Sequence, residues 1–271
     1  EGGGGFGGRL RLCIGRQAGC PDGHWALNVG GVKPMGDVCA DLEPSSVKHH
    51  HAWLFGHANP WFDTKLSWQE QQARTEAEQI AAVEEIAQGL TDNDLVDYGL
   101  AVERPYSLGT AVALSTLAPA RKEAILCLAF ARGKGNIERF VSGLLWGLQR
   151  QSGETAMRER LVEAIAATRP AVEIATIAFT LDAVADTWNL IASAGDETER
   201  LYWSRLNLQI ISEQEDVTVV VDKALGVNRG RAALSYIAGH ENLTVARDLI
   251  VRVMRDPSTI SGSGNAEDDN D

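Results

Sequence analysis

The side chains that could most readily do chemistry are histidines and cysteines gathered before residue 61. The stretch HHHAWLFGHANPWFD (49–63) places four histidines among two tryptophans and two phenylalanines. Thiolate and imidazole are the ligands that structural zinc sites use. One hypothesis is therefore a metalloprotein or enzyme whose site forms between the first sixty residues and the rest of the chain. The candidate ligands are Cys13, Cys20, His24, Cys39, His49, His50, His51 and His57.

The spacing of these residues argues against a common zinc motif. Cys13 and Cys20 are seven positions apart and no C-x-x-C occurs, whereas zinc motifs place their paired ligands about two to four residues apart. Three consecutive histidines cannot all face one ion on a regular element. We therefore predict no metal ligand. Bulky apolar side chains are expected to anchor this segment onto the first helices, with the histidines at an exposed rim. These anchors are Trp53, Leu54, Phe55, Trp61 and Phe62.

A Gly-Lys-Gly sequence within ARGKGNIERF (131–140) raises the question of a phosphate-binding loop. A Walker A loop needs a glycine five residues before its Gly-Lys pair, and Ser or Thr directly after the lysine. Leu128 and Gly135 occupy these two positions, so the pattern fails. Gly133 and Gly135 are predicted instead to end one helix and turn the chain into the next.

Motifs of hydrolytic enzymes are missing as well. No G-x-S-x-G occurs, and HENLT, which begins like a zincin motif, lacks the second histidine. Cys127 lies in the apolar run ILCLAF and is predicted to be a small core residue. Asp92 and Asp94 are expected to serve as a helix cap and as partners of the helix dipole. We predict no catalytic residue and no cofactor, and thus a non-enzymatic protein.

Surface recognition is the function that the residue types favour most. The sequence ERLYWSRL brings together the three side chains that dominate the energetic centres of protein interfaces. We predict that these residues bind a protein partner, while the alternative that the aromatic rings fill the core between helix layers stays open. The predicted protein-binding residues are Arg200, Tyr202, Trp203 and Arg205.

Composition narrows the class of partner. The 271 residues are 44% hydrophobic and 23% charged, with a formal net charge of −12. So acidic a chain is repelled by phosphate backbones unless its basic residues cluster, which predicts no nucleic-acid partner. The longest apolar run, AILCLAFA (124–131), is far shorter than the roughly 20 residues that span a bilayer, which predicts no membrane partner. Four scattered cysteines favour reduced thiols and a cytoplasmic location.

Local composition predicts three segments. Residues 1–60 are Gly-rich at the start and show no sustained period, so we expect an irregular N-terminal segment. Residues 61–257 carry helical patterns throughout and are predicted to form an α-helical domain. Residues 258–271 are polar and acidic, with nothing to bury, and are predicted to be disordered.

Helical periodicity begins at Ser67. The sequence SWQE is a capping box, in which Ser67 and Glu70 satisfy each other's backbone N–H groups. The apolar stripe that follows is expected to comprise Ala73, Ala77, Ile80, Val83, Ala87 and Leu90. The last helix is expected to bury Ala246, Leu249, Ile250, Val253 and Met254. Predicted helices cover about 67–89, 92–103, 106–117, 120–132, 136–149, 154–168, 171–181, 184–194, 197–205, 229–239 and 243–255.

Short links between these helices predict the fold class. DVTVVVDKAL (216–225) is ambiguous, since its valines favour a strand while its apolar residues also form a helical stripe. Links of a few residues make successive helices antiparallel. The chain is therefore predicted to be all-α, an irregular antiparallel helical array or α-solenoid of the HEAT/TPR-like kind.

Three stretches carry a resemblance to a known family: HAWLFGHANPWFD before the first long helix, LYWSRL at 201–206 and NRGRAALSYIAGH at 228–240. Over residues 50–255 the order of helices resembles the HEAT/TPR-like solenoids of large bacterial STAND-type signalling NTPases. The resemblance implies a sensing, binding or scaffolding region of a larger multidomain protein. It carries no nucleotide site, because this chain matches none of that family's nucleotide-binding motifs.

Overall fold

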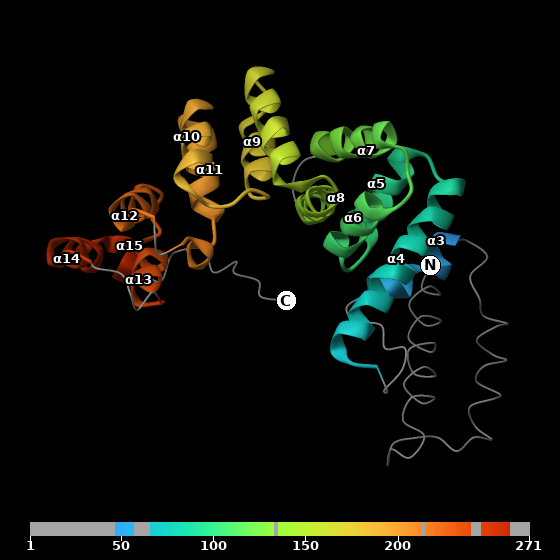
Figure 1. Ribbon diagram of the computed structural model, residues 1–271, viewed down its shortest axis with the longest axis horizontal. Coiled ribbons are helices and arrows are strands. Elements are labelled where there is room, and N and C mark those ends of the chain that lie inside the picture. The colour runs from blue at the N-terminus through green and yellow to red at the C-terminus, as the bar shows by residue number, and fades with distance from the viewer. Residues whose placement is uncertain (1–46, 57–65, 133–134, 213–214, 240–244, 261–271) are drawn as a thin grey trace, which may run out of the picture. The chain divides into compact units, whose positions relative to one another are not determined.

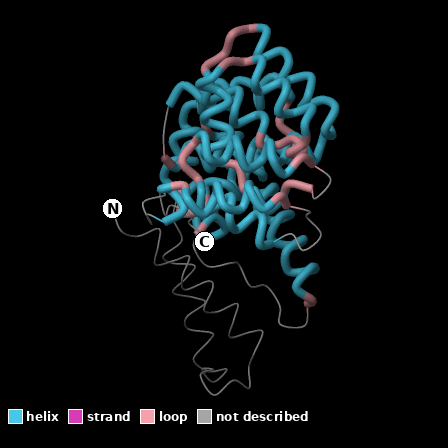
Figure 2. Tube along the Cα trace, turned by 90° about the vertical axis from the view of Figure 1, so that its left-hand side faces the viewer, coloured by secondary structure: helices cyan, strands magenta, loops and turns pink. Residues whose placement is uncertain are grey.

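The structure, a computed structural model, describes residues 47–56, 66–132, 135–212, 215–239 and 245–260. Within these ranges every regular element is a helix and none is a β-strand, as Figure 2 shows by its colours. The prediction of an all-α helical array is confirmed. No helix in the described ranges is long and apolar enough to cross a membrane.

The chain divides into two compact units, Glu1–Gln151 (unit 1) and Ser152–Asp271 (unit 2), and each is described by itself. Residues 61–257 were predicted to form one helical domain, with no boundary at this point. The predictions for residues 1–46 and 261–271 lie outside the described residues. The same holds for the candidate ligands Cys13, Cys20, His24, Cys39 and His57.

Unit 1 packs its helices in two layers. Helix α6 packs against α4 and against the first part of α8, while α5 packs against α7 in the second layer (Figure 1). This alternation follows from the short links between successive helices. The elements are α3 (Val47–His50), η1 (Ala52–Phe55), α4 (Trp68–Gly89), α5 (Asp92–Ala101), α6 (Pro105–Leu114), α7 (Pro119–Arg132) and α8 (Asn136–Ala166), whose first part belongs to this unit.

Capping boxes start the first two long helices. Ser67 caps α4 together with Glu70, as the sequence predicted, and Thr91 caps α5 together with Asp94. The predicted capping role of Asp94 is therefore confirmed. Each box satisfies backbone N–H groups that have no partner within the helix.

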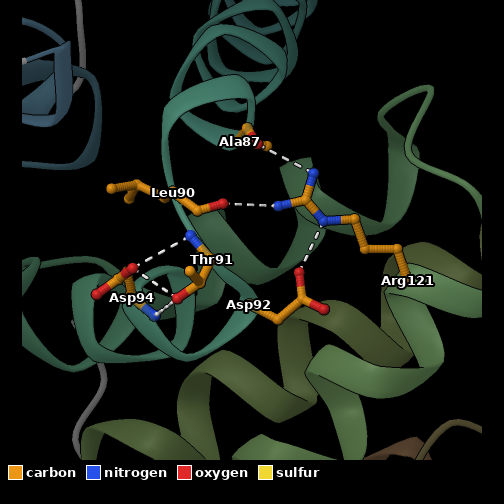
Figure 3. Close-up of polar contacts among 6 residues, drawn as sticks. All are labelled: Ala87, Leu90, Thr91, Asp92, Asp94 and Arg121. Carbon is orange, nitrogen blue, oxygen red and sulfur yellow. Dashed lines mark hydrogen bonds and ion pairs between the residues drawn. The ribbon is translucent and has the colours of Figure 1, made fainter.

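Arg121 of α7 clamps the corner between α4 and α5 (Figure 3). Its guanidinium donates to the carbonyl oxygens of Ala87 and Leu90, at 3.0 and 2.9 Å, and to the carboxylate of Asp92 at 2.7 Å. The carbonyls at a helix C-terminus lack partners within the helix and favour a cation. Arg121 therefore satisfies carbonyl groups at the end of α4 and pairs with a carboxylate at the start of α5.

The core of unit 1 differs in one respect from the predicted stripe of α4. Ala73 and Ala77 are exposed, and the helix buries Gln71 and Gln79 among its apolar residues instead. Gln79 is buried because its side chain donates to the carbonyl oxygen of Leu54 in η1, at 2.8 Å. The apolar pattern of α4 could not predict the burial of Gln79, because the hydrogen-bond partner of Gln79 lies on another element.

Of the predicted aromatic and apolar anchors, Leu54 and Phe55 are buried in η1, as expected. Phe55 packs edge-to-face against Tyr98 of α5, with ring centroids 6.4 Å apart. Trp61 and Phe62 lie outside the described residues.

Unit 2 continues with shorter helices. Helices α9 and α10 pack against α11, α12 packs against α13, and α13 also contacts α14 and α15. The ambiguous valine-rich segment is the helix α12, whose buried stripe includes Val220, Val221 and Ala224. The elements after the second part of α8 are α9 (Ala171–Ala178), α10 (Ala185–Ser193), α11 (Asp196–Arg205), η2 (Leu208–Ile210), α12 (Val217–Gly226), α13 (Gly230–Gly239), α14 (Arg247–Arg255) and α15 (Pro257–Ile260).

Two local expectations for unit 2 are corrected. Helix α14 buries Leu249 and Val253, but Ala246, Ile250 and Met254 are exposed. Helix α15 also extends regular structure to Ile260, into the segment predicted to be disordered. The two helices predicted on either side of residues 150–153 form the single element α8. Gly153, with φ 84° and ψ 171°, is its one non-helical residue and marks a kink.

Candidate functional site

The aromatic residues predicted to bind a partner lie in the core of unit 2. Tyr202 is 0% exposed and Trp203 is 1% exposed, whereas Arg200 and Arg205 on the same helix are exposed. Helix α11 packs against α9, α10 and α12, so the side of α11 with the largest apolar area is covered by neighbouring helices. Tyr202 and Trp203 are therefore core residues, which is the alternative that the sequence left open.

These two residues belong to an aromatic cluster that joins α9, α10 and α11. Phe179, directly after α9, stacks on Tyr202 with ring centroids 5.2 Å apart. The ring centroids of Trp188 in α10 and Trp203 are 5.2 Å apart, and the rings of Tyr202 and Trp203 meet edge-to-face. Such pairs stabilise a core by about 0.5–1.5 kcal/mol each beyond their buried area. The cluster thus holds three helices together.

Several polar atoms of this cluster have no hydrogen-bond partner among the described residues: the indole nitrogens of Trp188 and Trp203, and the hydroxyls of Thr187 and Tyr202. The Trp188 indole lies beside the Tyr202 hydroxyl without the geometry of a good hydrogen bond. Burial raises the pKa of Tyr202, and the neighbouring Trp188 opposes that shift. The cluster contains no group that could act as a general acid or base near neutral pH.

Unit 1 carries exposed aromatic residues that were not among the predicted protein-binding residues. Tyr106 of α6 and Trp146 of α8 are each 44% exposed. Arg150 stands one helical turn after Trp146, and its two terminal nitrogens donate to the two carboxylate oxygens of Glu76 in α4, both at 2.9 Å. We call Glu76, Tyr106, Trp146 and Arg150 the Trp146 surface.

Close packing of α6 on α8 positions this surface. A Cβ added at Gly143 would lie 2.0 Å from the carbonyl oxygen of Tyr106, and one added at Gly109 would lie 2.1 Å from that of Phe140. Thr110 of α6 also donates to the carbonyl oxygen of Gly143, at 3.1 Å. The backbones therefore touch, and Tyr106 is held beside the next two turns of α8.

Pro105 at the first position of α6 fixes where that helix begins, one residue before Tyr106. Trp146 and Arg150 follow Gly143 by three and seven residues, so they rise along the same side of α8. The surface thus draws on α4, α6 and α8, the helices of one layer of unit 1 (Figure 1).

The electrostatics of the Trp146 surface centre on Arg150, which pairs with Glu76 and interacts with Tyr106. The hydrogen bonds with Glu76 raise the pKa of Arg150 above its already high ordinary value. Partial burial raises the pKa of Tyr106, and the positive charge of Arg150 opposes that shift. Both Tyr106 and Arg150 therefore stay protonated near neutral pH, and these two side chains suit recognition rather than proton transfer.

The histidine segment contacts α4 through a side-chain hydrogen bond. His51 lies 2.8 Å from the carboxylate of Glu85 in α4, and its ring meets that of His50 edge-to-face. Across the described part of the chain, no three histidine, cysteine, aspartate or glutamate side chains are grouped as a metal would require. The Cys/His hypothesis involves residues outside that part and stays a prediction.

The two remaining chemical candidates are placed as follows. Cys127 is exposed on α7, so the prediction that it is a core residue is wrong. Its neighbours Ile125 and Leu126 fill the buried side of α7. Gly135 has φ 89°, a left-handed backbone that suits the turn predicted there, while Gly133 and Lys134 lie outside the described residues.

One sequence signal could have identified Trp146. Ile137 lies on the buried side of α8, and nine residues at about 100° each place Trp146 half a turn away from it. A large aromatic side chain opposite a strong apolar stripe is a candidate for surface recognition. No such signal exists for Tyr106. Its role depends on Arg150, which lies on another helix and far away in the sequence.

No family model, no curated protein and no solved structure matches this chain.

Proposed function

We propose that this protein is a non-enzymatic, helical-repeat protein that binds a protein partner through the Trp146 surface. The observation that carries the proposal is the pairing of two half-exposed aromatic rings, Tyr106 and Trp146, with an arginine that a bidentate ion pair already orders. Trp, Tyr and Arg carry most of the free energy in protein interfaces. Ordering Arg150 before binding lowers the entropy cost of association.

The proposed biological setting rests on the sequence. The resemblance to the solenoid regions of STAND-type signalling NTPases suggests a regulatory or scaffolding role within a larger bacterial protein. A cytoplasmic location is supported by the four cysteines, which are scattered along the sequence. These parts of the proposal are independent of the Trp146 surface.

Site-specific cross-linking tests the proposed surface. A photo-reactive amino acid at Ser142, one turn before Trp146, is expected to join a defined protein partner upon illumination. The same group at Gln88, on the exposed side of α4, is expected not to join it. The affinity of the identified partner is then measured for Trp146→Ala and Tyr106→Ala.

Each of these substitutions is expected to weaken binding about 30-fold, which corresponds to the roughly 2 kcal/mol of an interface hot spot. Trp68→Ala removes another exposed tryptophan among the described residues of unit 1; it is the matched control and is expected to bind normally. Melting temperatures of all variants must stay near that of the parent. Equal binding by the parent, Trp146→Ala and Tyr106→Ala would contradict the proposal.

A further inference from the structure

The side chains of the Trp146 surface offer hydrogen-bond donors, while their main acceptor is already engaged. The indole N–H of Trp146 and the hydroxyl of Tyr106 form no hydrogen bond with any described residue. Arg150 donates one N–H from each terminal nitrogen to Glu76 and carries further N–H groups that can reach a ligand. Both carboxylate oxygens of Glu76 accept these bonds. A ligand that matches the surface therefore brings acceptors and few donors.

The charges of the surface favour an uncharged ligand. Arg150 and Glu76 compensate each other in a bidentate pair, with both N–O distances at 2.9 Å. An acidic ligand would compete with Glu76 for Arg150, and a basic ligand would compete with Arg150 for Glu76. An acidic ligand would also approach a chain whose formal net charge is −12. Charge complementarity thus points to a neutral segment.

The exposed aromatic rings supply the apolar part of the surface. Tyr106 and Trp146 are each 44% exposed, and they extend from helices whose backbones touch at Gly143. Proline fits beside such rings, because its own ring is apolar and its backbone has a carbonyl acceptor but no N–H donor. In the polyproline II conformation the backbone makes no internal hydrogen bonds, so its carbonyl oxygens remain available. Proline-rich segments are recognised on aromatic-lined surfaces for these reasons.

We propose, building on the proposed function, that the partner presents an uncharged, proline-rich segment to the Trp146 surface. The pyrrolidine rings pack against Tyr106 and Trp146. Carbonyl oxygens of the segment accept from the indole N–H of Trp146 and from the N–H groups of Arg150 that Glu76 leaves available. The segment is extended before it binds, which lowers the entropy cost of association.

The test is an NMR titration of the full chain with synthetic peptides. The first peptide is capped and has about ten prolines, roughly 30 Å in polyproline II. Two others of equal length carry glutamate or lysine at every third position. The proline peptide is expected to shift the indole N–H signal of Trp146 and the Nε–H signal of Arg150 in a saturable way. The indole signal of Trp68, which is exposed on α4, is the control and is expected to stay in place.

Affinities for the three peptides decide the chemistry of the partner. The proline peptide is expected to bind most tightly, and its affinity should change less than about two-fold between roughly 0.05 and 0.5 M salt, because screening acts on charges. Trp146→Ala and Tyr106→Ala are each expected to weaken its binding at least about ten-fold. Trp68→Ala is expected to have no effect.

Three outcomes would overturn the inference: no shift of the Trp146 signal by the proline peptide, an equal shift of the Trp68 signal, or tighter binding of either charged peptide. The last outcome would assign the surface to an acidic or a basic partner. The cross-link from Ser142 separates this inference from the proposed function. A defined partner captured there without binding of the proline peptide would reject the proline-rich segment alone. Absence of both would reject the Trp146 surface as a binding site.

Discussion

Gly143 of α8 lies against the backbone of Tyr106 in α6, where a Cβ at position 143 would come within 2.0 Å of the Tyr106 carbonyl oxygen. This contact sets the distance between two helices that present Tyr106, Trp146 and Arg150. Gly147 repeats it one turn later, because a Cβ there would lie 2.5 Å from the Cβ of Ala113. The glycines therefore determine the geometry of the Trp146 surface as well as the packing of unit 1.

Replacing Gly143 with alanine should separate α6 from α8. The clash is with backbone atoms, which cannot rotate away, so we expect a loss of about 1–3 kcal/mol in the free energy of unfolding. Urea denaturation followed by circular dichroism measures it. Gly89→Ala is the control, since nothing lies within 4 Å of an added Cβ there. A Gly143→Ala protein as stable as the parent would show that the helices need not pack so closely.

Removing the Arg121 clamp should destabilise the corner between α4 and α5. Arg121→Met leaves the carbonyls of Ala87 and Leu90 without their charged donor, and hydrogen bonds to charged groups contribute roughly 1.5–3 kcal/mol. Because Arg121 is partly exposed, we expect a total loss of about 1–3 kcal/mol. Arg132→Met is the comparison: its exposed pair with Asp97 should contribute less than about 1 kcal/mol. Equal effects would mean that the clamp is an ordinary surface contact.

Because Trp203 is buried, we expect its removal to lower the stability of the folded protein. Trp203→Ala should lower the free energy of unfolding by about 3–5 kcal/mol, as large core truncations do. Arg200→Ala, on the exposed side of the same helix, should stay within about 0.5 kcal/mol of the parent. Thermal unfolding measures both. A folded Trp203→Ala protein with normal stability would return Trp203 to the surface and restore the first interpretation of ERLYWSRL.

Buried tyrosines should make the protein sensitive to alkaline pH. Burial raises the pKa of Tyr98 and of Tyr202 in the folded state above the ordinary value of about 10. Below that value both states keep these protons, and the stability due to burial is complete. As the pH rises above it, the unfolded chain loses protons that the folded chain retains, so the free energy of unfolding falls.

This pH effect is measured by urea denaturation between about pH 9 and pH 11.5, with tyrosinate absorbance as the probe of ionisation. Tyr202→Phe should flatten the decline. It should also leave stability near pH 7 unchanged or slightly higher, because the buried hydroxyl of Tyr202 has no partner among the described residues. A decline as steep as that of the parent would show that other groups cause the alkaline loss.

Local signals were sufficient to locate the helices. Ser67 and Glu70 mark the start of α4, and Pro105 and Pro119 begin α6 and α7, because caps and prolines act through the nearest backbone groups alone. Local signals could not decide between strand and helix for the valine-rich residues of α12. A valine-rich run has no intrinsic preference strong enough to decide, and packing against α13 favours the helix.

The sequence by itself determined that this protein is an all-α array with specific helix boundaries, since periodicity and capping depend on neighbours within a few residues. Only the tertiary structure decided where the buried side of a helix departs from its apolar pattern. Tyr202 and Trp203 entered the core because α9, α10 and α12 cover α11, while Ile250 and Met254 stayed exposed because no described helix covers that side of α14. The Trp146 surface likewise combines Glu76, Tyr106 and Arg150 from three helices. Their meeting depends on how closely glycines let those helices approach, a long-range property that no single segment encodes.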